Sequence, residues 1–336
     1  MVENALSSFW EKKKVLVTGG SGFLGSYVVQ KLRERGVEPE NLRIPRSRDM
    51  DLALRKNCVD AVSGMDVVIH LAARVGGIGF NRLHPAELFY ENAIMGIQLL
   101  EAARIERVEK YLQAGTVCSY PKFCPIPFTE ENLWNGYPEE TNAPYGIAKK
   151  MLIVQSQAYR AQYGLDSINL ICANLYGPRD NFDPARSHVI PALMAKFVTA
   201  VEEGLEEVTV WGTGQASREF LYVEDCAEAI VLAAERYHKP MPVNIGSGQE
   251  VKISELVALL AELTGFQGKI IWDSTKPDGQ PRRMLDISRA EAEFGFRATT
   301  DLATGLRNTL EWFRRNRTVI GSSGNRHLLR NEARPT

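Results

Sequence analysis

A glycine-rich turn near the N-terminus constrains the fold of this chain more than any other feature. Residues 14–36 read KVLVTGGSGFLGSYVVQKLRERG, in which Gly20, Gly22 and Gly25 fit the pattern G-x-G-x-x-G and Gly19 precedes them. Glycines at such spacing allow a tight turn after a strand, a close approach of the backbone to a pyrophosphate, and close packing of the following helix. The segment therefore predicts a strand, a turn and a helix beginning near Gly22 that together bind a dinucleotide. A purely structural turn is the alternative, because glycine-rich turns are common.

Short apolar runs alternate with longer segments of helical spacing through the first half of the chain. The runs span residues 14–19, 66–73, 110–115 and 167–177, and the helical segments span 26–36, 85–106 and 145–164. Strands that alternate with helices form a parallel sheet covered on both faces, and unalternated apolar runs are typical of strands buried on both sides. We therefore expect an α/β fold: a Rossmann-type doubly wound parallel sheet with a smaller C-terminal α/β substrate domain.

The pattern becomes less regular beyond about residue 178, where GPRDNFDPARS predicts a polar loop. We expect a dinucleotide-binding domain over 11–177, to which a segment near 219–247 returns. The substrate-binding domain then comprises 178–218 and 248–317. The polar C-terminal segment, 318–336, is expected to be a flexible tail.

Bulk properties exclude several classes of function. The 336 residues carry a formal net charge of −1, which argues against a large basic face for nucleic acid or anionic lipid. No apolar run approaches the roughly 20 residues needed to span a membrane, and the first ten residues lack the features of a signal peptide. The five cysteines form no Cys-x-x-Cys pair, so we expect neither disulfides nor a metal site. These features favour a reduced, cytoplasmic protein.

Two arginines bear on the choice of cofactor. Arg46 and Arg48 follow the expected second strand, about where an acidic residue would bind the ribose of NAD or an arginine the 2′-phosphate of NADP. An arginine fork matches a phosphate group well, so we favour NADP(H). Solvated loop charges are the alternative interpretation, and Asp49 and Asp51 lie nearby.

A Tyr-x-x-x-Lys pair at the start of a predicted helix indicates proton transfer. Tyr145 and Lys149 lie on one helix face, where a lysine charge would lower the pKa of the phenol. Spacing alone is weak evidence, because Tyr27 and Lys31 have the same spacing and we interpret them as ordinary helix residues. Tyr145 differs because it follows a loop and comes after Thr116, whose hydroxyl ends another predicted strand. Ligands in such folds bind beyond the carboxyl ends of the strands.

Cys118 and His188 are candidates for a second proton-transfer pair. Cys118 lies just past the strand that ends at Thr116, and His188 follows the loop that opens the second domain. A thiolate can take a proton from a carbon beside a ketone, and an imidazole can return one. A buried structural cysteine and a packed histidine are at least as common, and the residues alone leave both interpretations open.

Longer motifs give the chain a family resemblance. HLAARVGGIGFN, CSYPK, EETNAPYGIAKK, NLYGPRDNF, SHVIPALMAKF and KPDGQPRRMLD occur in this order. With VTGGSGFLG they resemble extended short-chain dehydrogenase/reductases, in particular the GDP-L-fucose synthase family, from about residue 13 to 316. The rival motif of a 4,6-dehydratase, an Asp-Glu pair after Thr116, is replaced here by Val117 and Cys118.

The resemblance implies a role for each matching residue. The catalytic residues would be Thr116, Cys118, Tyr145, Lys149 and His188. NADP(H) would contact Gly19, Gly20, Ser21, Gly22, Phe23, Leu24, Gly25, Arg46, Arg48, Leu71, Ala72, Ala73, Ala114, Gly115, Thr116, Val117, Tyr145, Lys149, Cys172, Ala173, Asn174, Leu175 and His188. The GDP-sugar would contact Asn174, Lys196, Trp211, Arg218 and Asp278.

The implied activity is an NADPH-dependent 3,5-epimerisation and 4-keto reduction of GDP-4-keto-6-deoxy-D-mannose to GDP-L-fucose. The alternatives are a related epimerase/reductase for another GDP-4-keto sugar such as a heptose, a redox-neutral NAD-dependent epimerase, and a non-catalytic Rossmann redox sensor. The sensor would have no need of Thr116, Tyr145 and Lys149 together. The resemblance also implies a homodimer formed through the helices near 85–105 and 145–163.

Overall fold

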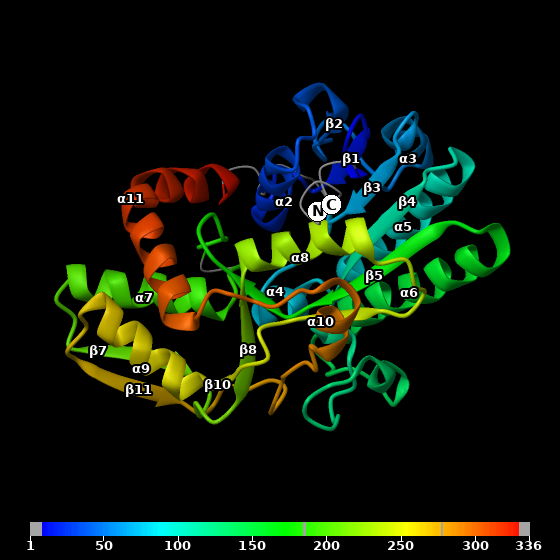
Figure 1. Cartoon of the computed structure of the whole chain (residues 1–336). Coiled ribbons are helices and arrows are strands. Elements are labelled where there is room, and N and C mark those ends of the chain that lie inside the picture. The colour runs from blue at the N-terminus through cyan, green and yellow to red at the C-terminus, as the bar shows by residue number, and fades with distance from the viewer. Residues whose placement is uncertain (1–8, 184–185, 277, 329–336) are drawn as a thin grey trace, which may run out of the picture.

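Six parallel strands form the central sheet of the computed structural model, which describes residues 9–183, 186–276 and 278–328 (Figure 1). Their order is β2-β1-β3-β4-β5-β9. The chain adds β2 on one side of β1 and β3 on the other, and this switch point is where doubly wound sheets bind ligands. The strands are β1 (Val15–Thr18), β2 (Leu42–Arg43), β3 (Val67–His70), β4 (Lys110–Thr116), β5 (Asp166–Cys172) and β9 (Val243–Ile245). The predicted fold class is confirmed.

Helices cover both faces of this sheet. In Figure 1, α2 and α8 pack against each other on one face, and α5 and α6 lie on the opposite face, where α3 also packs against α5. The helices are α2 (Phe23–Glu34), α3 (Arg55–Val62), α4 (Ile78–Leu83), α5 (Pro85–Ile105), α6 (Ala143–Tyr163) and α8 (Val223–Arg236). The predicted helices at 85–106 and 145–164 are thereby confirmed.

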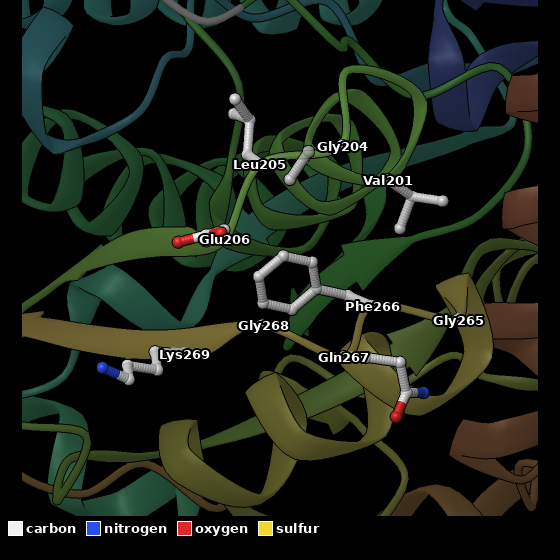
Figure 2. Close-up of a pocket in the computed structure, with 10 residues that line it drawn as sticks. Val201, Gly204, Leu205, Glu206, Gly265, Phe266, Gln267, Gly268 and Lys269 are labelled. Atoms are coloured by element: carbon white, nitrogen blue, oxygen red, sulfur yellow. The ribbon is translucent and has the colours of Figure 1, made fainter.

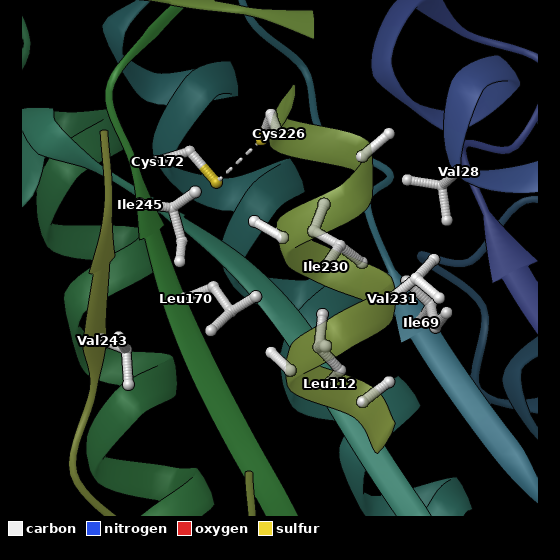
Figure 3. Close-up of a cluster of buried hydrophobic side chains, with 14 of the residues drawn as sticks. Val28, Ile69, Leu112, Leu170, Cys172, Cys226, Ile230, Val231, Val243 and Ile245 are labelled. Carbon is white, nitrogen blue, oxygen red and sulfur yellow. Dashed lines mark hydrogen bonds between the residues drawn. The ribbon is translucent and has the colours of Figure 1, made fainter. Parts of the chain in front are cut away.

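Alternate residues of β3 pack in different hydrophobic clusters. Val67 and Ile69 pack in the cluster that contains Val28 of α2 and side chains of α8, part of which Figure 3 shows. Val68 points to the other face and joins Leu99 of α5. Side chains alternate between faces along a strand, so a strand with helices on both sides is apolar at most of its positions. This requirement explains the unalternated runs of the sequence.

One predicted run forms two strands in different sheets. Residues 167–177 divide at Ala173, whose N–H donates to the carbonyl of Ile245 at 2.9 Å. The following strand, β6 (Asn174–Tyr176), leaves the central sheet and pairs with β8 (Ser217–Tyr222). Apolar residues continue across the break, because β5 is buried and β6 is at least partly buried, and so the sequence pattern does not reveal the break.

A second group of elements surrounds its own hydrophobic cluster. The sheet β10-β8-β6 and the parallel pair β11-β7 pack with three helices around side chains such as Phe197, Leu256 and Leu306. These elements include α7 (Val189–Glu202), β7 (Glu207–Trp211), β10 (Glu250–Lys252), α9 (Ile253–Thr264), β11 (Lys269–Asp273) and α11 (Leu302–Leu328), and α10 (Ser288–Phe294) lies nearer α8 and β9. The exact domain boundaries stay a prediction.

The C-terminal helix extends further than expected. α11 continues past residue 317 as far as Leu328, and residues 329–336 lie outside the described part of the chain. The flexible tail expected over 318–336 stays a prediction.

Two further observations concern the whole chain. Among the described residues, no helix has an apolar stretch long enough to cross a membrane. All five cysteines are free thiols, and Cys172 and Cys226 have their sulfur atoms 3.7 Å apart in the core (Figure 3).

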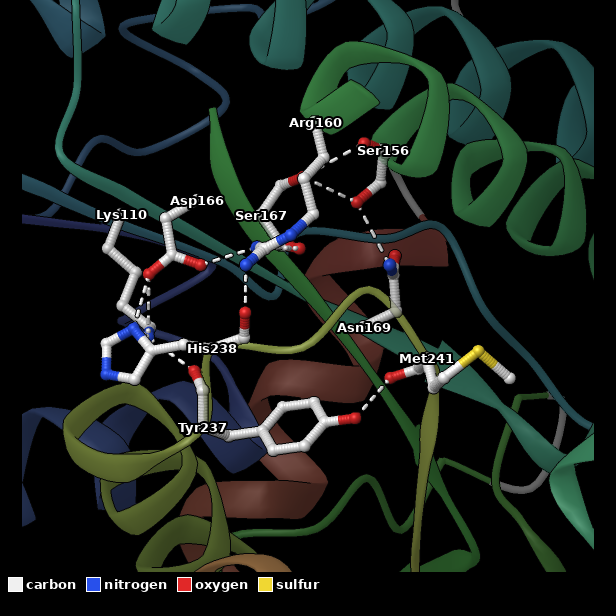
Figure 4. A network of polar contacts seen from close by, with 9 residues as sticks. All are labelled: Lys110, Ser156, Arg160, Asp166, Ser167, Asn169, Tyr237, His238 and Met241. Carbon is white, nitrogen blue, oxygen red and sulfur yellow. Dashed lines mark hydrogen bonds and ion pairs between the residues drawn. The ribbon is translucent and has the colours of Figure 1, made fainter. Parts of the chain in front are cut away.

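A polar network fastens the edge of the sheet at which β4 and β5 begin (Figure 4). Asp166 accepts hydrogen bonds from Arg160 at 2.6 Å, from His238 at 2.7 Å and from the buried Lys110 at 3.1 Å. Burial alone would raise the pKa of Asp166, but the hydrogen bonds from Arg160 and His238 and the charge of Lys110 lower it overall. Ionised Asp166 therefore stabilises the folded state.

We expect Asp166→Asn to lower the free energy of unfolding by roughly 2–4 kcal/mol near neutral pH, because it leaves the Lys110 ammonium buried without its carboxylate. A carboxyl whose pKa is lowered by folding stabilises above its unfolded pKa of about 3.9 and loses that effect as pH falls through the lower folded value. The difference in the free energy of unfolding between wild type and variant should therefore become smaller as the solution is acidified. Urea unfolding at several pH values measures it.

Asp60→Asn is the matched control, because Asp60 is exposed on α3. It should change the free energy of unfolding by less than about 0.5 kcal/mol. Equal stabilities for the two variants at neutral pH would contradict the role assigned to this network.

Candidate active site

The glycine turn lies where the carboxyl ends of β1 and β3 meet. Gly19 has φ +71°, and a Cβ placed on it would lie 2.9 Å from the backbone nitrogen of Ala72. A Cβ on Gly25 would clash with the carbonyl oxygen of Gly19, and Gly22 caps the N-terminus of α2. Side chains at Gly19 and Gly25 would thus break the turn, and the bare backbone leads to a helix N-terminus suited to an anion.

The other predicted cofactor residues follow neighbouring strands at this same edge. Thr18 Oγ1 lies 2.8 Å from His70 Nδ1 and accepts the N–H of Ala72 at 3.2 Å, which holds the ends of β1 and β3 together. Parallel strands end at one edge, so the structure brings these segments together. They are Gly20, Ser21, Phe23 and Leu24 after β1, Leu71 and Ala73 after β3, Ala114, Gly115, Thr116 and Val117 at the end of β4, and Cys172, Ala173, Asn174 and Leu175 at and beyond the end of β5.

The predicted phosphate-binding arginines are exposed beside this turn. A Cβ on Gly20 would lie 2.8 Å from the Ile44 side chain, so the segment that leads to Arg46 passes next to the glycines. Arg46 and Arg48 are both exposed, and Arg48 Nε contacts Asp49 at 3.3 Å. Arg43, which precedes them, donates to three carbonyls at the end of α3.

Tyr145 and Lys149 lie on the first turns of α6, beside Thr116. Burial raises the pKa of the Tyr145 phenol, the charges of Cys118 and Cys172 raise it further, and a hydrogen bond with Thr116 opposes the rise. The sequence predicts that Lys149 lowers this pKa, whereas the causes that act on Tyr145 in the structure are burial and its three neighbours. Lys149 is itself buried, and burial lowers its own pKa to about 8, which leaves the amine mostly protonated near neutral pH.

The other pair with this spacing is structural, as predicted. The Tyr27 hydroxyl donates to the carbonyl of Pro178 at 3.0 Å, and Lys31 pairs with Glu34 at 3.0 Å on the surface of α2.

Cys118 lies in a short 3-10 turn directly after β4. Its N–H donates to Thr116 Oγ1 at 3.2 Å, and the neighbouring Ser119 hydroxyl donates to the Gly146 carbonyl of α6 at 2.9 Å. This packing places Cys118 beside Tyr145, whose pKa it affects. The half-buried thiol also accepts a contact from Arg283 Nη1 at 3.5 Å.

His188 is the N-cap of α7, and the residue is exposed to solvent. Protein atoms around the ring remove part of its hydration and lower the pKa of the imidazole. The Gly77 N–H donates to the carbonyl of Arg186 at 3.1 Å, which ties the segment before His188 to the loop beyond β3. No hydrogen bond joins His188 to Cys118 within the described residues, so the proximity of the two stays a prediction.

The predicted sugar-nucleotide residues lie on the second group of elements. Lys196 of α7 donates to the Thr209 carbonyl at 2.6 Å, and Trp211, at the end of β7, is 60% exposed. Asp278 accepts from the N–H and hydroxyl of Thr213, which follows Trp211.

Two further residues predicted to contact the sugar nucleotide, Arg218 and Asn174, donate hydrogen bonds to backbone carbonyls. Arg218 Nη2 donates to the Asp278 carbonyl at 2.9 Å, and its Nη1 donates to the carbonyls of Ser217 and Gln280. Asn174 donates to the Glu219 carbonyl at 3.0 Å. Arg218 therefore fixes the turn that carries Asp278 as well as placing charge in the site, and burial lowers its pKa to about 10.

Two residues near Cys118 were missed by sequence reasoning. Arg283 and Gln280 contact the cysteine and its loop from the segment KPDGQPRR. The adjacent arginines of that motif, Arg282 and Arg283, are the sequence signal that could have identified this contact.

A separate hollow lies away from these residues, between the end of α7 and the β7–β11 pair (Figure 2). None of the predicted site residues lines it. Its lining comprises Ala200, Val201, Gly204, Leu205, Glu206, Gly265, Phe266, Gln267, Gly268 and Lys269.

Comparisons with known proteins agree on the kind of molecule. The family model described as the NAD dependent epimerase/dehydratase family matches residues 15–246. GDP-L-fucose synthase 1 of Arabidopsis thaliana is 43% identical over 319 residues, which cover 94% of this chain and 98% of the relative.

Two solved structures have the same fold and were determined with NADP bound. A GDP-L-fucose synthetase of Naegleria fowleri has a TM-score of 0.81 and 26% identity, with 91% of this chain and 95% of that chain covered. A GDP-mannoheptose C4 reductase of Campylobacter jejuni has a TM-score of 0.81 and 25% identity, with 90% and 98% covered.

Proposed function

This chain belongs to the NAD dependent epimerase/dehydratase family, and from that premise we propose that it is an NADPH-dependent GDP-L-fucose synthase. It would epimerise GDP-4-keto-6-deoxy-D-mannose at C3 and C5 and then reduce the C4 ketone. The carrying observation is that Thr116, Cys118 and Tyr145 meet at the carboxyl edge of the sheet, beside the glycine turn. A redox-neutral epimerase needs no thiol at this position.

The residues at the edge of the sheet fit a dinucleotide. The cradle formed by Gly19 and Gly25 would be filled by any side chain, and it leads to the N-terminus of α2. Arg46 and Arg48 are exposed beside it and would bind the 2′-phosphate that distinguishes NADP from NAD. When bound, NADPH supplies the hydride that reduces C4.

Cys118 and His188 would carry the epimerisation. The C4 ketone acidifies the protons on C3 and C5, so the Cys118 thiolate can remove each in turn. Thr116 and Tyr145 would donate hydrogen bonds to the enolate oxygen, on which the negative charge develops. His188 would return a proton to the opposite face of each carbon, which inverts the configuration.

Tyr145 would complete the reduction by giving its proton to the C4 oxygen. Its raised pKa keeps the phenol protonated and ready to donate. Lys149, buried beneath it, would hold the nicotinamide ribose. The chain thereby keeps one acid for the oxygen and a separate base for the carbons.

The charge of the second region suits a nucleoside diphosphate. Arg218 is partly buried on β8, and Lys196 is exposed on α7. A diphosphate carries the negative charge that such a group of cations requires. The exposed Trp211 face offers a stacking surface for a base or sugar.

The curated relatives support the fucose substrate, since the GDP-L-fucose synthase of Arabidopsis thaliana shares 43% identity with the chain. The solved structures do not distinguish the two sugars, because the fucose synthetase and the heptose reductase share 26% and 25% identity with it. The same catalytic residues would serve both sugars, so this choice depends on the substrate pocket and requires a direct test.

A homodimer in the cytoplasm is part of the proposal. α5 and α6 pack side by side and expose Tyr90, Ile97 and Val154, and an apolar hollow lies between their first turns. An exposed apolar face of this kind is typical of a subunit interface. The free thiols of the protein fit a reducing compartment.

Turnover in deuterated water tests the proposed function. With GDP-4-keto-6-deoxy-mannose and NADPH, the protein should consume one NADPH per sugar and yield GDP-L-fucose that carries deuterium at C3 and C5. NMR of the product measures both positions, because each inversion replaces a carbon-bound proton with one from solvent.

The contradicting outcomes are separable. NADPH consumption without deuterium at C3 or C5 would remove the epimerase activity. Failure to use this sugar, together with turnover of a GDP-4-keto-heptose, would refute the substrate assignment and leave the reaction class intact.

A further inference from the structure

Arg283 reaches the reactive thiol from a distant part of the chain. Its Nη1 donates to Cys118 Sγ at 3.5 Å, and its Nε donates to Gln280 Oε1 at 2.7 Å. Arg283 is 6% exposed, so its guanidinium has little contact with water. A guanidinium beside a sulfur favours the thiolate over the neutral thiol.

The arginine is held in this position by the loop that carries the cysteine. Gln280 is 2% exposed, and its Nε2 donates to the carbonyls of Pro121 at 3.3 Å and Lys122 at 3.2 Å. Gln280 thus binds the chain just beyond Cys118 with its amide nitrogen and orients Arg283 with its amide oxygen. A fork fixed in this way needs little reorganisation when negative charge develops on the sulfur.

The charge of Arg283 has no carboxylate partner among the salt bridges between described residues. The adjacent Arg282 differs, because it is 59% exposed and pairs with Glu250 on the surface. A buried charge is costly without an opposite charge, and the Cys118 sulfur that Arg283 contacts can supply one as a thiolate.

Other charged and titratable groups also face this point. Tyr145 approaches Cys118 from α6, and Arg218 approaches from β8. Asp278 and Glu139 act on Arg218, and Arg283 opposes its charge. Of these two cations, Arg283 donates to the sulfur at 3.5 Å, whereas Arg218 donates to three carbonyls.

We propose that Arg283 is a positioning residue that holds Cys118 as the thiolate needed for proton abstraction, a role that rests on the proposed function. The guanidinium of Arg283 orients the Cys118 sulfur through this hydrogen bond and is the counter-ion of the thiolate. Gln280 links the arginine to the loop that follows Cys118, because its side chain is hydrogen-bonded to both. The base is therefore prepared by the fold before any sugar enters.

Alkylation of the intact protein by iodoacetamide tests this role without a sugar nucleotide. The rate at the Cys118 peptide is followed by mass spectrometry across a pH series for wild type, Arg283→Gln and Arg283→Lys. Arg283→Gln should move the half-maximal rate upward by about one to three pH units, because the opposite charge is lost. Arg283→Lys should restore most of the wild-type profile, because it keeps the charge.

The chain offers its own controls. Arg282→Gln removes the neighbouring exposed arginine and should leave the Cys118 profile unchanged. Cys124, whose pKa burial raises to about 11, reports on the same peptide region and should react slowly in every variant near neutral pH.

Two results would overturn the proposal. One is a wild-type alkylation profile for Arg283→Gln. The other is a rise in KM for the sugar nucleotide with unchanged alkylation and unchanged kcat for deuterium exchange, which would make Arg283 a diphosphate ligand. If Arg283→Gln does not fold, the Arg283→Lys profile decides, since a shift of more than one unit despite the retained charge would contradict a counter-ion role. Because alkylation uses no sugar, these failures are distinguishable from failure of the proposed function.

Discussion

Tyr145→Phe is expected to reduce the rate of NADPH-dependent ketone reduction by about 10²–10⁴-fold, the usual contribution of a positioned general acid. The substitution removes the hydroxyl that donates the proton to C4 oxygen and leaves the ring, which packs beside Thr116 and Cys118. The affinity for NADPH should change little, because the glycine turn and α2 are untouched. Stopped-flow absorbance of NADPH gives the reduction rate, and fluorescence titration gives the affinity.

Tyr27→Phe is the matched control for this substitution. Tyr27 has the same spacing to a lysine, but its hydroxyl donates to the Pro178 carbonyl. Its loss should cost about 1 kcal/mol of unfolding free energy and leave the reduction rate within about twofold. A Tyr145→Phe enzyme that reduces the ketone at the wild-type rate would exclude Tyr145 as the acid.

Cys118→Ser should suppress deuterium incorporation at C3 and C5 by a factor of about 10²–10⁴. A serine hydroxyl has a much higher pKa than a thiol, so it supplies far less of the anion that removes the proton. Its similar size should preserve the turn after β4. NADPH binding should be retained, since the contacts of Cys118 are with Thr116 and Arg283 and not with the glycine turn. Product NMR in deuterated water measures the exchange.

Cys124→Ser tests whether any loss of exchange is specific to Cys118. Cys124 is another half-buried thiol of the same loop, and its loss should leave deuterium incorporation near the wild-type level. If Cys118→Ser instead weakens cofactor binding as much as it slows exchange, Cys118 is a structural residue and the epimerase mechanism needs another base.

The predicted local elements agree with the structure where the deciding contacts lie close in sequence. The turn after β1 is predictable because Gly19 adopts positive φ and Gly25 faces the Gly19 carbonyl within the same short segment. Helical spacing likewise identified α5 and α6.

Other features were misjudged because their causes lie far along the chain. The run 167–177 has the pattern of one strand, but the structure divides the run between two sheets. Ala173 donates a hydrogen bond to Ile245, and the following strand β6 pairs with β8. Lys149 was expected to lower the pKa of Tyr145, but the surrounding core desolvates both groups. The protein atoms that cause this desolvation come from several segments, and helical spacing contains no information about them.

Local sequence was enough to predict the glycine turn, the alternation of strands and helices along the chain, and the residue types available for proton transfer, because these depend on backbone sterics and on spacing within a few turns. Which of those residues share an environment depends on the three-dimensional fold. Arg283 meets Cys118 across 165 positions of sequence, and burial then sets the pKa of Tyr145 and Lys149. Desolvation and charge pairing are properties of neighbours in space, and the fold alone chooses those neighbours.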